Sequence, residues 1–211
     1  MFDCCVRRAR YKGKFELVYT SSSQVIVKRL STGSRIILKS NFGHSIGKID
    51  IFKDQFLVAH TDETLLVGDL ATCKLSEINW HHSQSEKFYF DIENFCMIFN
   101  AGELNIVEYG VNEIIGSCRT EFTNPHLISI RFEENKKSSQ SRMIAYLVDA
   151  QTIQVVNLTT GFTVATISHD CKIDWLEVQF LFSFGKEFIS LAFLQCQQDH
   201  LPRQEISLVP V

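Results

Sequence analysis

The heptapeptide VGDLATC at residues 67–73 has two counterparts in the chain, VKRLSTG at 27–33 and VVNLTTG at 155–161. Each copy reads Val, two residues, Leu, one residue, Thr and then Gly or Cys. Glycine adopts a positive φ without a Cβ penalty, so the pattern predicts an apolar strand followed by a tight turn. Cys73 takes the glycine position in the second copy, and we therefore expect a somewhat different turn there.

The spacing of the heptapeptides indicates a repeat. The step from Leu30 to Leu70 is repeated from Leu70 to Gly110, and the next step, to Leu158, is longer by eight positions. One polar insert, EENKKSSQSR at 133–142, accounts for this extra length and is expected to form a loop between two strands of the fourth repeat. The shorter step is a period of about 40 residues, which is typical of WD40-type β-propeller blades.

Each period contains four short apolar segments rich in Val, Ile and Phe. In the second period they are IGKIDIF, DQFLVAHT, ETLLVGDL and KLSEINW. Asp, Asn, Gly, Ser or Thr separates such segments, which predicts antiparallel strands. The positions expected to be buried in these strands are Ile26, Ile49, Leu66, Ile106, Ile130 and Val155.

The predicted fold class is therefore all-β, a partial and unclosed WD40-type β-propeller with about three to four four-stranded blades. Residues 15–177 form the blades of this prediction, and residues 178–211 form a divergent tail. Residues 1–14 are assigned to a strand or linker from a preceding propeller, unless CCVRRARY supplies the opening strand of the first blade.

Charge and composition exclude several classes of protein. The chain has 211 residues, with 21 Lys plus Arg against 24 Asp plus Glu, so no overall field favours nucleic acid as a partner. Seven cysteines without a CxxC pattern predict reduced thiols in a protein that is not secreted, and we expect no secretory signal because MFDCCVRRARYKGK has no apolar run. The most apolar stretch, residues 179–194, is interrupted by Gly185, Lys186 and Glu187, so no transmembrane segment is expected.

The sequence contains no GxSxG, HExxH, GxxxxGK[ST] or GxGxxG motif. We therefore expect no catalytic residue, cofactor, metal site or small-molecule substrate, and a protein that is not an enzyme. The adjacent His81 and His82 are interpreted as loop residues in preference to metal ligands. Asp69, which stands at a WD-type position, and His44 are interpreted as members of a buried hydrogen-bond network in preference to a catalytic acid and base.

A cluster of cations near the N-terminus is the candidate binding feature. It consists of Arg7, Arg8, Arg10, Lys12 and Lys14. These side chains could contact the phosphates or carboxylates of an anionic partner, and the alternative interpretation is a solvated linker, because only Tyr11 interleaves with them.

Long segments resemble one family throughout residues 2–177. They include FDCCVRRARYKGKFELVYTSSSQVIVKRLSTGSRIILKS, LVAHTDETLLVGDLATCKLSEINW, CMIFNAGELNIVEYG and YLVDAQTIQVVNL, and they are similar to the intraflagellar transport protein 172 family. The resemblance implies an internal fragment, covering the end of a first propeller and the start of a second. It also implies a non-enzymatic scaffold of intraflagellar transport complex B that acts in cilium assembly and axonemal transport. Other complex B subunits would be its partners, at the ciliary base and axoneme on the cytoplasmic side.

The resemblance stops after Trp175, Leu176 and Glu177. Two alternative interpretations stay open beside the scaffold. One is a propeller adaptor that binds phosphate or RNA through the basic N-terminal arm, and the other is a truncated product without a function of its own.

Overall fold

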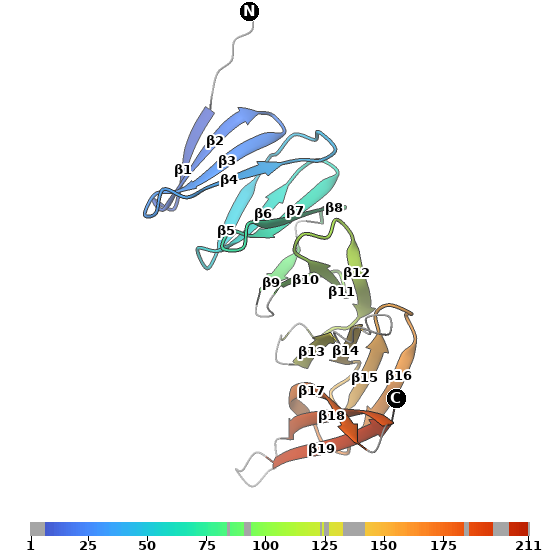
Figure 1. Cartoon of the computed structure of the whole chain (residues 1–211). Helices are drawn as coiled ribbons and strands as arrows, with labels where there is room; N and C mark the ends of the chain where they lie inside the picture. Colours follow the sequence, from blue (N-terminus) through green and yellow to red (C-terminus); the bar gives the residue numbers. More distant parts are fainter. Residues whose placement is uncertain are drawn as a thin grey trace, which may run out of the picture. The chain divides into compact units, whose positions relative to one another are not determined.

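The computed structural model describes residues 7–83, 85–90, 94–122, 124, 127–132, 142–183, 186–195 and 203–210. Every element with assigned bounds in these residues is a β-strand, and the strands form five antiparallel sheets (Figure 1). In the part of the chain so described, no helix is long and apolar enough to cross a membrane.

The strands follow the chain in order, one sheet after another. The first sheet contains β1 (Arg7–Tyr11), β2 (Phe15–Ser21), β3 (Gln24–Arg29) and β4 (Arg35–Lys39). The second contains β5 (Ile49–Phe52), β6 (Phe56–His60), β7 (Thr64–Asp69) and β8 (Lys74–Asn79). The third contains β9 (Lys87–Tyr89), β10 (Phe95–Asn100), β11 (Glu103–Glu108) and β12 (Ile114–Arg119). The fourth contains β13 (Ile128–Phe132), β14 (Arg142–Leu147), β15 (Thr152–Asn157) and β16 (Thr163–Ser168). The fifth contains β17 (Ile173–Ser183), β18 (Lys186–Gln195) and β19 (Arg203–Pro210).

Four consecutive four-stranded meanders are the blades predicted from the repeat period, and the all-β partial propeller is confirmed. The opening strand of the first blade is β1, which pairs with β2 from Arg7↔Tyr19 to Tyr11↔Phe15. CCVRRARY thus includes the opening strand that the sequence left open as an alternative. Within the tail, residues 178–183, 186–195 and 203–210 contribute to a three-stranded sheet, for which the sequence predicted no structure.

The chain divides into two compact units. The first unit holds the first two sheets together with residues 94–96 and 107–114. Its core is built from alternate residues of facing strands, as the period of two in a β-strand requires. The buried side chains are Phe15, Leu17, Val25, Val27 and Leu38 from the first sheet and Ile46, Ile49, Ile51, Leu57, Ala59, Leu66 and Leu70 from the second sheet and its flanking residues.

The second unit holds the fourth and fifth sheets with the rest of the third. Its apolar cluster consists of Leu127, Ala145, Leu147, Ile153, Val155, Ile173 and Leu176. Strands β13 and β14 pair directly as far as Phe132↔Arg142, so they are the first two strands of the fourth blade. The insert itself, apart from Arg142, lies outside the described residues.

Five of the six predicted buried positions are confirmed, with Ile49, Leu66, Ile106, Ile130 and Val155 all buried. The prediction for Ile26 is wrong, because this residue is only half-buried while Val25 and Val27 on either side are buried. The segment QVIVKR is apolar at three successive positions, and its alternation can be assigned to either face. A shift of one residue exchanges the two faces of a strand, which explains the error.

The repeated heptapeptide ends at a residue with a positive φ in all three copies. Gly33 and Gly161 both have a φ of 74°, and Cys73 has a φ of 59°. The turn at Cys73 thus shares the positive φ of the two glycine copies. The amide of Gly33 donates to Arg29 O at 2.9 Å, and the amide of Gly161 donates to Asn157 O at 2.8 Å. Cys73 adopts a left-handed conformation that residues other than Gly rarely take, and this conformation costs about 1–2 kcal/mol.

Candidate protein-interaction surface

The first sheet has two unlike faces. On the face toward the core, Ala9, Leu17, Val27 and Ile36 form one row of cross-strand neighbours, and rows containing Tyr11–Phe15 and Tyr19–Val25–Leu38 flank it. All of these side chains belong to the core cluster or pack against it. This face is therefore covered by the second sheet.

The opposite face is called here the outer face. One of its rows is Arg8, Val18, Ile26 and Ile37, and the next row is Arg10, Glu16, Lys28 and Arg35. Gln24 and Lys39 pair on the other side of the apolar row. Within the first unit the described residues leave this face open, and the Ile37 side chain is 58% exposed.

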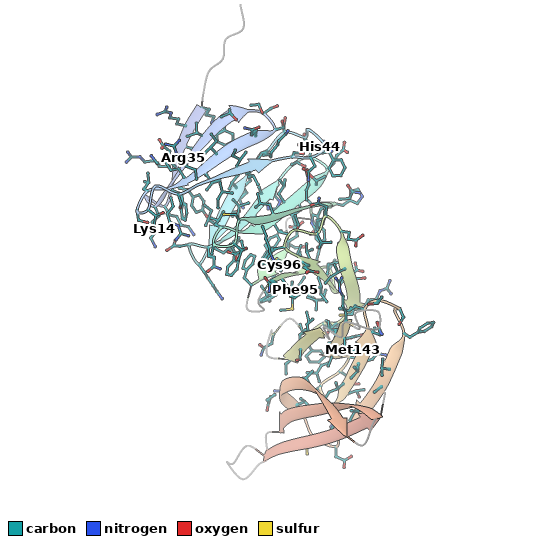
Figure 2. All side chains as sticks on the ribbon, viewed as in Figure 1. Lys14, Arg35, His44, Phe95, Cys96 and Met143 are labelled. Atoms are coloured by element: carbon teal, nitrogen blue, oxygen red, sulfur yellow. The ribbon has the colours of Figure 1, made fainter. Side chains whose placement is uncertain are left out.

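The five predicted contact residues lie in different surroundings. All five are exposed or half-exposed, but only Arg8 and Arg10 belong to the outer face. Arg7 lies with its guanidinium carbon 5.4 Å from the centre of the Tyr19 ring. Lys14 forms an ion pair with Asp54, and Lys12 Nζ lies 3.5 Å from Ile51 O (Lys14 is labelled in Figure 2).

Three further cations join Arg8 and Arg10 on the outer face: Lys28, Arg35 and Lys39 (Arg35 is labelled in Figure 2). The sequence analysis missed them because they are far from the N-terminal cluster in the chain. The sequence signal was weak, because RIILK at 35–39 has three consecutive apolar residues; only the two-residue period of a strand places Arg35, Ile37 and Lys39 on one face. The only intramolecular ion pair among the members of these rows is that of Lys28 Nζ with Glu16 Oε2, at 4.0 Å.

A buried carboxylate is the second polar feature that the sequence did not reveal. Glu77 is 1% exposed, and its Oε1 accepts hydrogen bonds from Ser40 Oγ at 2.7 Å and from Thr64 Oγ1 at 2.8 Å. Its Oε2 accepts a hydrogen bond from the amide of Asn41. The amide of Glu77 donates to Asn112 Oδ1 at 2.9 Å. The three donors to the Glu77 carboxylate replace the hydrogen bonds with water that the carboxylate loses when it is buried.

His82 contacts His60 instead of forming a site with His81. His82 Nε2 lies 2.9 Å from Thr61 O, so this nitrogen carries the proton, and the Nδ1 atoms of His60 and His82 are 3.1 Å apart. Burial lowers the pKa of His60, and the neighbouring His82 lowers this pKa further. In the described ranges no group of three or more His, Cys, Asp or Glu side chains is placed to hold a metal ion.

Asp69 caps the turn that follows β7. Its Oδ1 accepts hydrogen bonds from Gln55 Nε2 at 2.9 Å and from the amide of Ala71 at 2.8 Å, and its Oδ2 accepts one from Thr72 Oγ1 at 3.0 Å. Burial alone would raise the pKa of this carboxyl group, but the hydrogen bonds outweigh burial and hold the pKa below its usual value. Asp69 thus belongs to a hydrogen-bond network, as the sequence favoured, but His44 lies apart from it, with its Nε2 3.8 Å from Glu63 Oε2.

Comparison with known proteins identifies close relatives. No family model matches the chain. The intraflagellar transport protein 172 homolog of Danio rerio is 56% identical over 182 residues, which cover 84% of this chain and 10% of the relative. The homolog of Homo sapiens and the protein of Chlamydomonas reinhardtii are each 54% identical over 181 residues, again with 84% of this chain covered. The chain thus spans about one tenth of the length of these curated relatives.

Solved structures are similar only at a coarse level. A structure titled "KlHsv2 with loop 6CD replaced by a Gly-Ser linker" is 11% identical, covers 98% of this chain and 71% of its own, and has a TM-score of 0.37. The computationally designed Ika4 protein is 16% identical, covers 79% of this chain and 92% of its own, and has a TM-score of 0.36. At these TM-scores neither structure contributes to the assignment.

The repeat period and the successive four-stranded sheets define a segment of a WD40-type β-propeller. Within this class, relatives that are more than half identical over most of the chain identify the family. The chain belongs to the intraflagellar transport protein 172 family.

Proposed function

We propose that this chain is a non-enzymatic scaffold segment of an intraflagellar transport complex B subunit that acts in cilium assembly and axonemal transport. The single observation that carries the proposal is its 54–56% identity to relatives named intraflagellar transport protein 172. Its site of action would be the ciliary base and axoneme, and its partners would be other complex B subunits. The mechanism is passive, because the blades hold surface side chains in fixed positions for partner proteins to bind.

The outer face of the first sheet supports an interaction role. Its half-buried and exposed apolar side chains are surrounded by charged ones, as in the polar rim and apolar centre of protein interfaces. A propeller adaptor for phosphate or RNA has less support. Arg7 stacks on Tyr19 and Lys14 pairs with Asp54, and the rows of the outer face contain no aromatic side chain for base stacking.

A chimera tests the scaffold proposal. The matching segment of the Danio rerio relative is replaced by residues 7–177 of this chain, and the chimera is expressed in ciliated cells that lack their own homologue. We expect the chimera to restore cilia and to recover complex B subunits in a quantitative pulldown. A version that lacks the segment corresponding to residues 15–169 should do neither. Normal cilia and full recovery of every subunit with this deletion would contradict the proposal.

A further inference from the structure

We propose that His60 and His82 form a two-histidine site for a divalent transition-metal ion of the class that imidazole nitrogens prefer, with Zn²⁺ as the reference ion. The Nδ1 atoms of the two rings lie 3.1 Å apart. The site is additional to the proposed scaffold function and does not depend on it. It lies within the first compact unit, and it is defined by the contact between these two side chains, not by an exposed face of a sheet.

Two separate segments of the chain bring the rings together. His60 is the last residue of β6, and His82 follows β8 on the segment that leads to β9. The two residues are 22 positions apart, so their spacing in the sequence gave no indication of a joint site. A metal ion bound by both rings would tie the segment after β8 to the end of β6.

The distance between the two nitrogens matches that of a pair of zinc ligands. Zn²⁺ binds a histidine nitrogen at about 2.0–2.1 Å with tetrahedral angles, so two ligating nitrogens lie about 3.3 Å apart. The observed Nδ1–Nδ1 distance of 3.1 Å differs from this value by about 0.2 Å, which is within the tolerance for a metal site.

The directions of the rings favour coordination over a straight hydrogen bond between them. With the two nitrogens at their observed separation, a shared zinc ion would hold the ring centres about 4.8 Å apart. A straight N–H···N hydrogen bond along the axes of both rings would hold the centres about 5.4 Å apart. The observed distance between the ring centres is 4.7 Å, as expected when both rings face a common point beside the line that joins the nitrogens.

A backbone carbonyl fixes the orientation of one ring. His82 Nε2 lies 2.9 Å from Thr61 O and carries the proton, which leaves a lone pair on His82 Nδ1. Metal-ligating histidines ordinarily donate their other ring N–H in this way, because the hydrogen bond fixes the ring and its tautomer. When His60 ligates, its ring proton moves from Nδ1 to Nε2 by exchange with water. His60 then presents the Nδ1 lone pair, and both rings stay neutral.

The charges around the pair favour neutral rings and a bound cation. Burial, followed by His82, lowers the pKa of His60, so protons compete little with a metal ion for this ring at neutral pH. Glu86 Oε1 lies 3.9 Å from His82 Nδ1. Burial would raise the pKa of the Glu86 carboxyl group, but hydrogen bonds from the Ser83 amide and Trp80 Nε1 hold the pKa below its usual value. An ionised carboxylate at this distance stabilises a divalent cation.

The number of protein ligands sets the strength of the site. Among the described residues no group of three or more His, Cys, Asp or Glu side chains is placed to hold a metal ion, so water would occupy the other two tetrahedral positions. Lys48 opposes a cation near His60, but Asp50 neutralises Lys48 through an ion pair at 2.7 Å. We therefore expect reversible binding that is weaker than at a structural zinc site with four protein ligands.

Zinc titration of the 211-residue chain tests the site, with calorimetry for the affinity and a phosphine reductant to keep the thiols reduced. At a free Zn²⁺ concentration about five times the dissociation constant, the thermal midpoint of the wild type should rise by about 2–4 °C. His60→Gln and His82→Gln should each weaken binding at least about tenfold and remove this rise. The exposed His81→Gln is the matched control and should behave as the wild type.

The cysteines require a separate control, because thiolates also bind zinc. Co²⁺ in place of Zn²⁺ identifies the ligands, since only a thiolate gives a sulfur-to-cobalt charge-transfer band in the near ultraviolet. We expect the visible bands of four-coordinate Co²⁺ in the wild type and their loss in His60→Gln and His82→Gln. If every cobalt band persists in both variants, the ion is held by cysteines and the inference is overturned.

The affinity for Zn²⁺ should also fall with pH, because protons compete with the ion for both imidazoles. Between about pH 7.5 and pH 5.5, the range in which histidine titrates, we expect a loss of at least about tenfold in the wild type. This measurement needs no substitution, so it decides the question even if a variant fails to fold. Circular dichroism without metal checks the fold of each variant.

Three outcomes would overturn the inference. They are the absence of a zinc-dependent rise in the thermal midpoint, equal zinc affinity of the wild type and both histidine variants, and an affinity that stays constant over this pH range. None of them bears on the scaffold proposal, which the chimera tests by the recovery of complex B subunits and cilia.

Discussion

Ser40 Oγ donates a 2.7 Å hydrogen bond to Glu77 Oε1 and so connects two residues that are 37 positions apart in the chain. Ser40 directly follows β4 of the first sheet, and Glu77 lies within β8 of the second. Because the carboxylate also accepts hydrogen bonds from Thr64 and from the amide of Asn41, it fixes the end of the first sheet to the second. The network holds in place the strand whose opposite face carries Ile37 and Arg35.

Glu77→Gln is predicted to destabilise the chain. An amide presents one acceptor and one donor where the carboxylate presents two acceptors, so at least one of the three donors loses its partner. We expect the free energy of unfolding to fall by about 1–3 kcal/mol, as measured by urea denaturation. Glu63→Gln in the same unit is the matched control, because the side chain of Glu63 is 74% exposed and its replacement should leave stability nearly unchanged. Equal stability of the two variants would show that the network contributes nothing.

Tyr109→Phe is predicted to stabilise the chain. The Tyr109 hydroxyl is buried without a hydrogen-bond partner among the described residues, and burial raises the pKa of this hydroxyl. Removal of an unsatisfied polar group should raise the free energy of unfolding by about 1 kcal/mol. The control is Tyr146→Phe, which should lower it by about 1 kcal/mol because the Tyr146 hydroxyl donates to Gln154 Oε1 at 2.6 Å. A loss of stability in both variants would mean that the Tyr109 hydroxyl has a partner in solution.

Cys73→Gly should increase stability through the turn of the second heptapeptide. Cys73 has a φ of 59°, and glycine adopts this conformation without the Cβ clash that costs about 1–2 kcal/mol. The greater freedom of glycine in the unfolded chain offsets part of the gain, so we expect a net increase of about 0.5–1 kcal/mol in thermal or urea unfolding. Gly33→Ala, at a φ of 74° with no atom near the added Cβ, should lower stability by about 1 kcal/mol through the backbone alone. A loss of stability in Cys73→Gly would indicate that the contacts of the thiol stabilise the fold by more than the left-handed backbone of Cys73 costs.

Stability should depend on pH through His60. Burial, then His82 and Lys48, lower the pKa of this imidazole below its ordinary value of 6.5, while Glu86 and Asp50 raise it. The folded chain therefore binds a proton at His60 less readily than the unfolded chain does. The contribution to stability is fully present above pH 6.5 and is lost as the pH falls below that value toward the lowered pKa.

The measurement is the urea midpoint between about pH 7.5 and pH 5.5, the range in which histidine titrates. The wild-type midpoint should fall with pH, and His60→Gln should make the slope shallower. The exposed His81→Gln is the control and should leave the slope as in the wild type. If both variants retain the wild-type slope, the pH dependence arises elsewhere.

The repeat period was sufficient to predict the blades, because the apolar alternation of each strand is local in the chain. The choice between Val25, Ile26 and Val27 was not predictable, since all three are β-branched and only the contact with the second sheet decides which face is buried. Glu77 also gave no signal, because a carboxylate within KLSEINW reads as solvent-exposed until the donors of Ser40 and Asn41 come into reach. The sequence predicted only some of the outer-face cations. Arg35 was missed because it joins the row of Arg10 through cross-strand pairing, which spacing along the chain does not show.

The pairing of Phe132 with Arg142 has a practical consequence for reporter design. Residues paired across an antiparallel ladder lie about 5 Å apart, so the chain leaves β13 and re-enters β14 at almost the same point. A fluorescent domain whose own termini are close together can replace residues 133–141 without separating the two strands. Such a fusion would carry its label on the fourth blade and leave the first blade unmodified.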